Sequence, residues 1–343
     1  MDKEYYLTLN GWRFIFSLLI VWTHLPNDWK GISAYYNYGN TIVLIFFILS
    51  GFLIGLKYKS HFENDLSYYR EFIIKRSATI FPLQWLMTLL FSLFSINIVT
   101  YWAIPFNLTL TQSLVPFWEI NFSINVPAWF LSSIFICYLL TPFVLLFSSK
   151  NGTLFISFYL SVVICWNLFI LVLPDSIGTR WLCYINPLCR FIDFTMGIIL
   201  SLYWKEIKKI SMKLLNGKVV STVLEIMIIV AIFICFIDES LQNFNDFTFI
   251  RYPLILLFLI IFSLSSGLLS KILSSKIFYQ LGELSIAIYM SHIFVLYFIK
   301  KIDLSSDSKI ILTYIFTILF ASLLVRYYCP YMQKKVVKLL TKK

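Results

Sequence analysis

The chain has 343 residues, of which 59% are hydrophobic, 19% are aromatic and only 13% are charged. A soluble domain usually carries about 25% charged residues, so this composition excludes an ordinary soluble enzyme and also a disordered chain. The formal net charge of +11 comes from basic residues between apolar stretches, where Lys and Arg report orientation in a bilayer rather than nucleic-acid binding. The sequence therefore predicts a membrane protein with many spans.

Ten apolar stretches predict an all-α bundle of transmembrane helices, because each is close to the roughly 20 residues that cross a bilayer. They cover 9–27, 39–57, 78–100, 128–148, 153–173, 184–204, 219–237, 252–270, 281–299 and 309–327. Strict two-residue alternation, the mark of a membrane β-barrel, is not seen. The first stretch carries no small-residue cleavage site and is expected to be a retained span. A single membrane domain over 1–343, with no additional soluble domain, is expected.

The basic residues predict the orientation of these spans. Ten spans place both termini on one side, and twenty of the 28 Lys and Arg residues then fall on that side, against seven on the other. The positive-inside rule makes the first side cytoplasmic. The stretch 77–118 has no charged residue and is too long for one span. Its second part is predicted to be an outer loop or a re-entrant segment that lies against protein.

The first span carries polar residues on one face. Asn10, Arg13, Ser17 and His24 share this side, and Arg13 and His24 are eleven residues apart, about three turns and about 16 Å along the axis. In one interpretation Arg13 snorkels to the headgroups and His24 bonds a neighbouring helix. In the other the face lines a cavity in which His24 exchanges protons, as histidine does near neutral pH. The spacing alone leaves both open.

Other polar residues near the predicted spans have simpler interpretations. Arg190 and Asp193 are three residues apart and are expected to pair on one helix face. Cys183 and Cys189 flank a predicted outer loop, where their spacing allows a disulfide. His292, in the ninth predicted span, is by itself more typical of helix packing.

Residues 68–76 combine aromatic side chains with Arg70, Lys75 and Arg76. They indicate either a topology anchor or a site for a phosphorylated cofactor, because the arginine fork and the lysine ammonium both bind phosphate. His61, in the polar loop before them, is assigned no role. The sequence has no glycine-rich phosphate loop, zinc spacing or G-x-S-x-G motif, so neither a metal site nor a tightly bound cofactor is predicted.

Five segments, taken in order, resemble the acyltransferase 3 family of bacterial multi-span membrane enzymes, which acylate, and most often O-acetylate, surface sugars. They are Leu9–Arg13 with His24, Phe46–Ile54 with Ser50, Lys75–Pro82, Ala128–Leu131 with Trp129, and Leu281–His292 with Glu283. The resemblance covers nearly the whole chain. The chain differs from the common family pattern at Thr79, where a second arginine usually follows Arg76, and at Ile134, where a glutamate is frequent.

The resemblance implies a membrane O-acyltransferase with acetyl-CoA or another acyl-CoA as cytoplasmic co-substrate. It implies a lipid-linked or growing polysaccharide as the sugar acceptor, in the inner membrane of a bacterial cell. His24 would act as general base, with an acyl-histidine intermediate as a variant. Arg13 would be the second catalytic residue, orienting the donor or stabilising developing charge.

The resemblance also implies donor binding through Arg76, Lys75 and Arg70. Supporting roles would fall to Ser50, Trp129, Glu283 and His292. Two alternatives remain open at this stage: a transporter or flippase for a polysaccharide precursor, and a structural subunit of a glycan assembly complex. The transporter explains the spans and the polar face equally well, but not the match to the late histidine span.

Overall fold

A computed structural model of the chain describes residues 4–31, 39–94, 101–173, 177–214, 217–237 and 248–341. Every regular element among these residues is a helix, which confirms the predicted all-α class. Within these described ranges, six helices are long and apolar enough to cross a bilayer, or up to eight if each of two bent pairs counts as one span. Ten spans were expected. Residues 95–100, at the end of the third predicted span, and Lys3, Lys342 and Lys343 lie outside the described residues.

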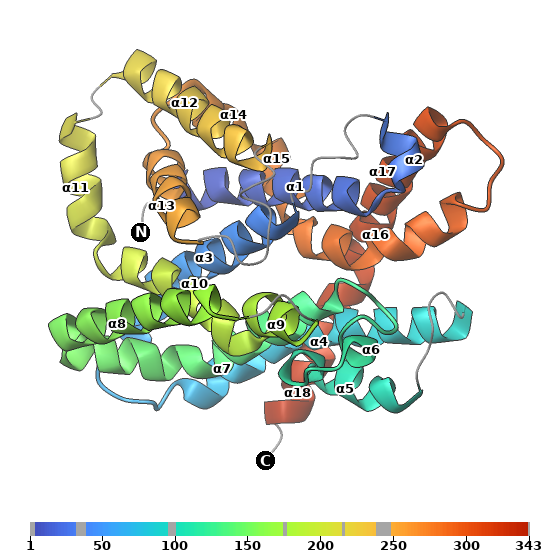
Figure 1. Ribbon diagram of the computed structural model, residues 1–343, viewed down its shortest axis with the longest axis horizontal. Coiled ribbons are helices and arrows are strands. Elements are labelled where there is room, and N and C mark those ends of the chain that lie inside the picture. Colours follow the sequence, from blue (N-terminus) through green and yellow to red (C-terminus); the bar gives the residue numbers. More distant parts are fainter. Residues whose placement is uncertain are drawn as a thin grey trace.

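The long apolar helices form the body of the molecule (Figure 1). They are α3 (Gly39–Tyr58), α4 (Tyr69–Phe94), α7 (Ala128–Lys150), α8 (Gly152–Leu171), α10 (Pro187–Leu202) and α17 (Ser306–Leu323), which continues into η7 (Leu324–Tyr328) and α18 (Cys329–Thr341). The bent pairs are α11 (Trp204–Leu214) with α12 (Lys218–Ile237), and α15 (Lys276–Glu283) with α16 (Ser285–Ile299). Many large apolar side chains of α8, α12 and α17 are exposed, as expected for surfaces that face lipid.

Helix α1 (Glu4–His24) runs through the middle of the molecule (Figure 1). It packs against α3, α13 (Thr248–Leu264), α14 (Leu268–Leu273), α15 and α16. Its polar residues therefore meet protein rather than lipid. Thr8 Oγ1 lies 2.9 Å from Ser265 Oγ, and Asn10 Nδ2 donates to Tyr279 O at 2.9 Å. This placement explains how a helix with so polar a face is accommodated.

The contact between α3 and α10 is a direct approach of two backbones. A Cβ atom on Gly51 would collide with the carbonyl oxygen of Phe194, and one on Gly197 would collide with that of Ile48. Only glycine fits at both positions, and small residues of this kind let membrane helices pack closely. The α3–α10 pair thereby forms a rigid wall beside α1.

Helix α4 begins at Tyr69, nine residues before the predicted start of the third span at 78. Most of the basic segment 68–76 is therefore the first two turns of that helix and not a loop. After it, the described residues 101–127 form short helices, including α5 (Ile104–Thr109) and α6 (Trp118–Asn121). They are anchored on the long helices, for example by Gln84 Nε2, which donates to Asn107 O at 3.1 Å. This agrees with the predicted non-spanning segment.

The predicted Arg190–Asp193 pair is confirmed, with Arg190 Nη1 2.7 Å from Asp193 Oδ2. Both side chains are buried, and Tyr252 completes the network by donating its hydroxyl to Asp193 Oδ1 at 2.6 Å. The disulfide that the spacing of Cys183 and Cys189 allowed is not formed, because both are free thiols. Cys189 Sγ instead donates to the carbonyl oxygen of Cys183 at 2.9 Å.

Candidate functional site

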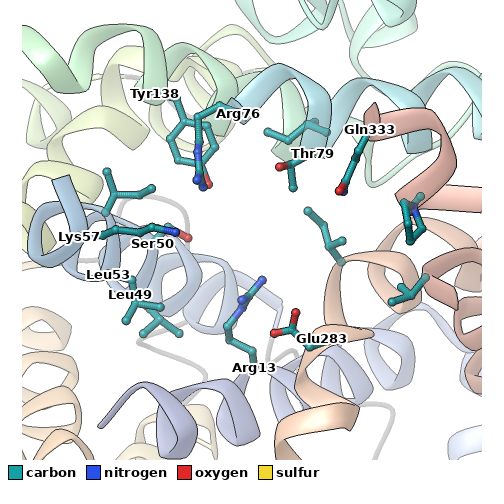
Figure 2. Close-up of a pocket in the computed structure, with 16 residues that line it drawn as sticks. Arg13, Leu49, Ser50, Leu53, Lys57, Arg76, Thr79, Tyr138, Glu283 and Gln333 are labelled. Carbon is teal, nitrogen blue, oxygen red and sulfur yellow. The ribbon is translucent and has the colours of Figure 1, made fainter. Parts of the chain in front are cut away.

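A central cavity of about 530 Å³ lies between α1, α3, α4, α7, α15 and α18. Arg13, Lys57 and Arg76 bring positive charge to its described lining, and Glu283 brings one negative charge. Figure 2 shows Arg13 and Arg76 pointing toward each other across the cavity, from α1 and α4. The excess of positive charge suits an anionic ligand.

The amide of Asn10 links Arg13 and Glu283. Asn10 Nδ2 donates to Glu283 Oε1 at 3.1 Å, and Arg13 Nη1 donates to Asn10 Oδ1 at 3.3 Å. The Asn10 side chain on α1 thus holds the Glu283 carboxylate of α15 and the Arg13 guanidinium of its own helix. The guanidinium of Arg13 is thus held through Nη1 and extends into the cavity (Figure 2).

Arg76 is positioned by aromatic rings. Its Nη2 donates to Tyr58 Oη at 2.7 Å. Its guanidinium carbon lies 5.3 Å from the ring centroid of Tyr58 and 5.8 Å from that of Phe72, within the range of cation–π attraction. Arg76 Nε is buried and has no partner among the residues that the structure describes. The rings therefore hold the Arg76 guanidinium at the cavity wall, and its Nε–H can still donate a hydrogen bond.

Three residues near Arg76 on α4 are placed differently from it. Lys75 Nζ lies 2.6 Å from Glu71 Oε1 and donates to Tyr68 Oη at 2.6 Å, and it lines a neighbouring cavity. Thr79 lines the central cavity, and its hydroxyl donates to Lys75 O at 2.9 Å. Arg70 is exposed and donates to Leu340 O at 3.1 Å, at the C-terminal end of α18. The structure therefore does not bring Arg70 to either cavity.

The central cavity continues into a narrow slot of about 50 Å³. Arg13, Ser50 and Tyr138 line both spaces. Beyond them the wall becomes apolar or aromatic, with Phe130, Ile134, Tyr289 and others. Ile134, where the family pattern often has a glutamate, is a buried apolar wall residue of this slot. The space thus changes from a wide cationic mouth to a small apolar end.

His24 and His292 come together beyond the slot, with ring centroids 4.9 Å apart. Their Nδ1 atoms lie 2.9 Å from Ile20 O and 3.3 Å from Ile288 O respectively. A carbonyl oxygen only accepts hydrogen bonds, so each ring carries its proton on Nδ1 and a lone pair on Nε2. His292 is fully buried, and its Nε2 has no partner among the described residues.

Tyr289 connects the slot with the histidine pair. It lines the slot, and its ring centroid lies 6.2 Å from that of His292. His24 itself is not part of the described lining of the slot or of the central cavity. A single aromatic side chain thus lies between the apolar end of the cavity and His292, which in turn neighbours His24.

Trp129 lies away from the cavity. It is buried, with its ring 4.8 Å from that of Tyr184 and 6.4 Å from that of Phe130. Because Phe130 lines the slot, Trp129 supports the slot wall from behind.

Sequence reasoning missed several lining residues, including Lys57 and Tyr138. Helical spacing carried the signal for both. Lys57 follows Ser50 by seven residues, and Tyr138 follows Ile134 by four, so each pair shares a helix face.

A family model described as an acyltransferase domain matches residues 6–327. No curated protein and no solved structure matches the chain significantly.

Proposed function

We propose that the chain, which belongs to this acyltransferase family, moves an acetyl group from acetyl-CoA to a hydroxyl of a surface or exopolysaccharide sugar. The family and the apolar helices make it a multi-pass membrane acyltransferase. Donor, acceptor and catalytic residues are our proposal. The observation that carries it is the cationic cavity beside an apolar slot, whose wall residue Tyr289 lies next to His292, the ring partner of His24.

The charge of the central cavity supports acyl-CoA as donor. CoA carries phosphate groups. The guanidinium groups of Arg13 and Arg76 and the ammonium group of Lys57 are cations that bind phosphate. Lys57 and Arg76 belong to the set of basic residues that the positive-inside rule assigns to the cytoplasm. We therefore place the cavity mouth at the cytoplasmic face of a bacterial inner membrane. Acyl-CoA from the cytoplasm could enter it there.

The size of the slot supports a short acyl group. The slot, which Arg13 helps to line, has a volume of only about 50 Å³, and this favours a two-carbon acyl group over a fatty chain. The apolar side chains of Phe130 and Ile134 favour a methyl group over a charged or polar one. Acetyl is therefore the acyl group we propose.

His24 is the proposed general base. Its Nε2 lone pair takes the proton of the acceptor hydroxyl while the hydroxyl oxygen attacks the thioester carbonyl carbon. The carbon–sulfur bond then breaks, and the departing thiolate takes the proton from the His24 imidazolium to leave as free CoA. His292 supports this cycle, because its buried Nε2 lone pair is an acceptor beside a ring that becomes charged.

Arg13 is the proposed donor-orienting residue. It stands eleven residues before His24 on α1, about 16 Å along the helix axis, which favours contact with the phosphates or arm of the donor over contact with the reacting carbonyl. Glu283 acts through Asn10, which holds both side chains. Ser50, on the wall shared by cavity and slot, is placed to meet the donor arm.

The test is transfer of radiolabel from acetyl-CoA to cell-surface glycan by membranes that contain equal amounts of wild-type chain or His24→Ala. We expect label with the wild type and a loss of about 10²–10⁴-fold in the variant. Equal transfer by a correctly inserted His24→Ala protein would refute the role of His24. Solute uptake into vesicles without any covalent label would refute the acyltransferase and favour the transporter.

A further inference from the structure

A second cavity, which we call the side cavity, opens next to the central one and has a volume of about 460 Å³. The two share Lys57, Arg76, Thr79 and Gln333 as walls, so they are adjacent chambers. The function proposed above uses only the central chamber. The side cavity therefore needs an account of its own.

Aromatic rings line the side cavity. The ring centroids of His61 and Tyr68 lie 4.5 Å apart, and Tyr58 lies 5.7 Å from His61. Tyr58 is buried, whereas His61 is exposed and Tyr68 half-buried. The ring surfaces that a ligand in this chamber can reach are therefore those of His61 and Tyr68.

Cations surround these rings. Lys75 Nζ donates to Tyr68 Oη at 2.6 Å and lies 5.2 Å from the centroid of its ring, and Arg76 and Lys57 stand at the wall shared with the central cavity. Glu71 pairs with Lys75 and offsets part of this charge, but it is not among the described lining residues. The chamber remains cationic.

Aromatic faces beside phosphate-binding cations are the chemistry that recognises a nucleotide. A base stacks on aromatic rings through its π-face, and phosphates pair with Lys and Arg. An inorganic phosphate or a lipid headgroup would use the cations alone and leave the rings without a ligand. The rings thus favour a nucleotide.

We propose that the side cavity holds the adenosine 3′-phosphate end of the CoA donor, with the adenine on His61 and Tyr68. The diphosphate then lies at Lys57 and Arg76, where the chambers meet, and the pantetheine arm crosses the central cavity to the slot. This inference rests on the proposed use of acyl-CoA. It adds a nucleotide subsite that selects CoA over shorter thioesters.

The first test measures binding of adenosine 3′,5′-bisphosphate to the purified full chain in detergent. We expect His61→Ala and Tyr68→Ala to weaken binding at least tenfold, and His61→Phe, which keeps an aromatic face, to retain it. Tyr331→Ala is the matched control, since Tyr331 is exposed on α18 with Lys335 Nζ 4.9 Å from its ring. Equal binding by His61→Ala and wild type, or equal affinity for pyrophosphate and the bisphosphate, would overturn the proposal.

The second test separates this inference from the proposed function. Initial transfer rates are compared for acetyl-CoA and for acetyl-pantetheine, which lacks the nucleotide. We expect His61→Ala to raise KM for acetyl-CoA at least tenfold and to leave transfer from acetyl-pantetheine unchanged. Equal KM values of the wild type for both thioesters would overturn the nucleotide subsite. A wild type that transfers from neither thioester would instead refute the acyltransferase, and the binding assay would still decide the nucleotide subsite.

Discussion

The imidazole rings of His24 and His292 lie 4.9 Å apart, although the two residues stand near opposite ends of the chain. Each ring is fixed through Nδ1 by a carbonyl of its own helix, which directs the basic Nε2 away from the backbone. Leaving a buried polar atom without a partner usually costs about 1–3 kcal/mol, and the structure leaves His292 Nε2 in that state. This arrangement supports the proposal that the pair receives a proton during the reaction.

Replacing His292 with phenylalanine tests this arrangement, because the ring is kept and both nitrogens are removed. A hydrogen bond to a charged group contributes about 1.5–3 kcal/mol, so we expect kcat for acetyl transfer to fall about 10–100-fold. KM for acetyl-CoA should stay constant, since His292 lies outside the described lining of the cavities. Steady-state kinetics on purified protein measure both. His292→Asn, which retains an acceptor, should recover part of kcat, and no recovery would point to a packing role.

Arg76 and Arg70 form a matched pair for donor binding. Arg76 lines both cavities, whereas Arg70 donates to Leu340 O at the end of α18. We expect Arg76→Gln to raise KM for acetyl-CoA about tenfold or more, as for loss of a charge-assisted hydrogen bond, and Arg70→Gln to leave it unchanged. Initial rates over a range of acetyl-CoA concentrations give both values. A higher KM in Arg70→Gln alone would contradict the placement of the donor.

Ile134 should set the length of the acyl group. Ile134→Ala removes an apolar wall of the slot, and two further methylene groups of a donor could then be buried at about 0.8 kcal/mol each. We expect the ratio of butyryl to acetyl transfer to rise about tenfold. Leu131→Ala is the control, since Leu131 is buried on the same helix outside the described lining. The same rise in both variants would mean general loosening of α7.

Gly197 should be intolerant of even a methyl group. Its Cβ would collide with the carbonyl oxygen of Ile48, and overpacking of this kind typically costs about 1–3 kcal/mol. We expect Gly197→Ala to unfold at a lower temperature in detergent than the wild type. Gly152→Ala should not, because its Cβ would lie 3.6 Å from Tyr203 Oη, an ordinary contact. Indistinguishable unfolding curves for the two variants would contradict the close α3–α10 contact.

Contacts within one helix were predictable from sequence, and contacts between helices were not. The spacing of Arg190 and Asp193 predicted their pairing, because residues three apart meet on a helix face. His24 and His292 were singled out separately, but their meeting depends on how α1 packs against α16. Residue spacing within each span carries no information about that packing.

The predicted position of Arg70 was wrong because the predicted start of the helix was wrong. Segment 68–76 was interpreted as lying before the third span, where periodicity does not apply. In the structure α4 begins at Tyr69, and Arg70 and Arg76 are six residues apart, or about 240° around the helix. They therefore point in different directions, and only Arg76 reaches the cavities.

The span count differed from prediction for local reasons. The stretch 281–299 was interpreted as one span, but the chain bends by 56° between α15 and α16. This bend leaves Glu283 at the end of α15, where it lines the cavity. Helix α13 has an apolar part of only 14 residues, Arg251–Leu264, and α1 carries the polar face that meets the cavity. The helices α1 and α15, which line the cavity, thus differ from a straight, apolar membrane span.

Arg13 and Gln333 line the same cavity from α1 and α18, the first and the last helices of the described residues. A ribosome that has inserted α1 into the membrane must still make α18 before the cavity has its full wall. Interrupted synthesis, or proteolytic loss of α18, would leave an inserted protein that cannot enclose a donor. If the proposed thioester donor binds there, such an incomplete copy would lack part of its binding wall.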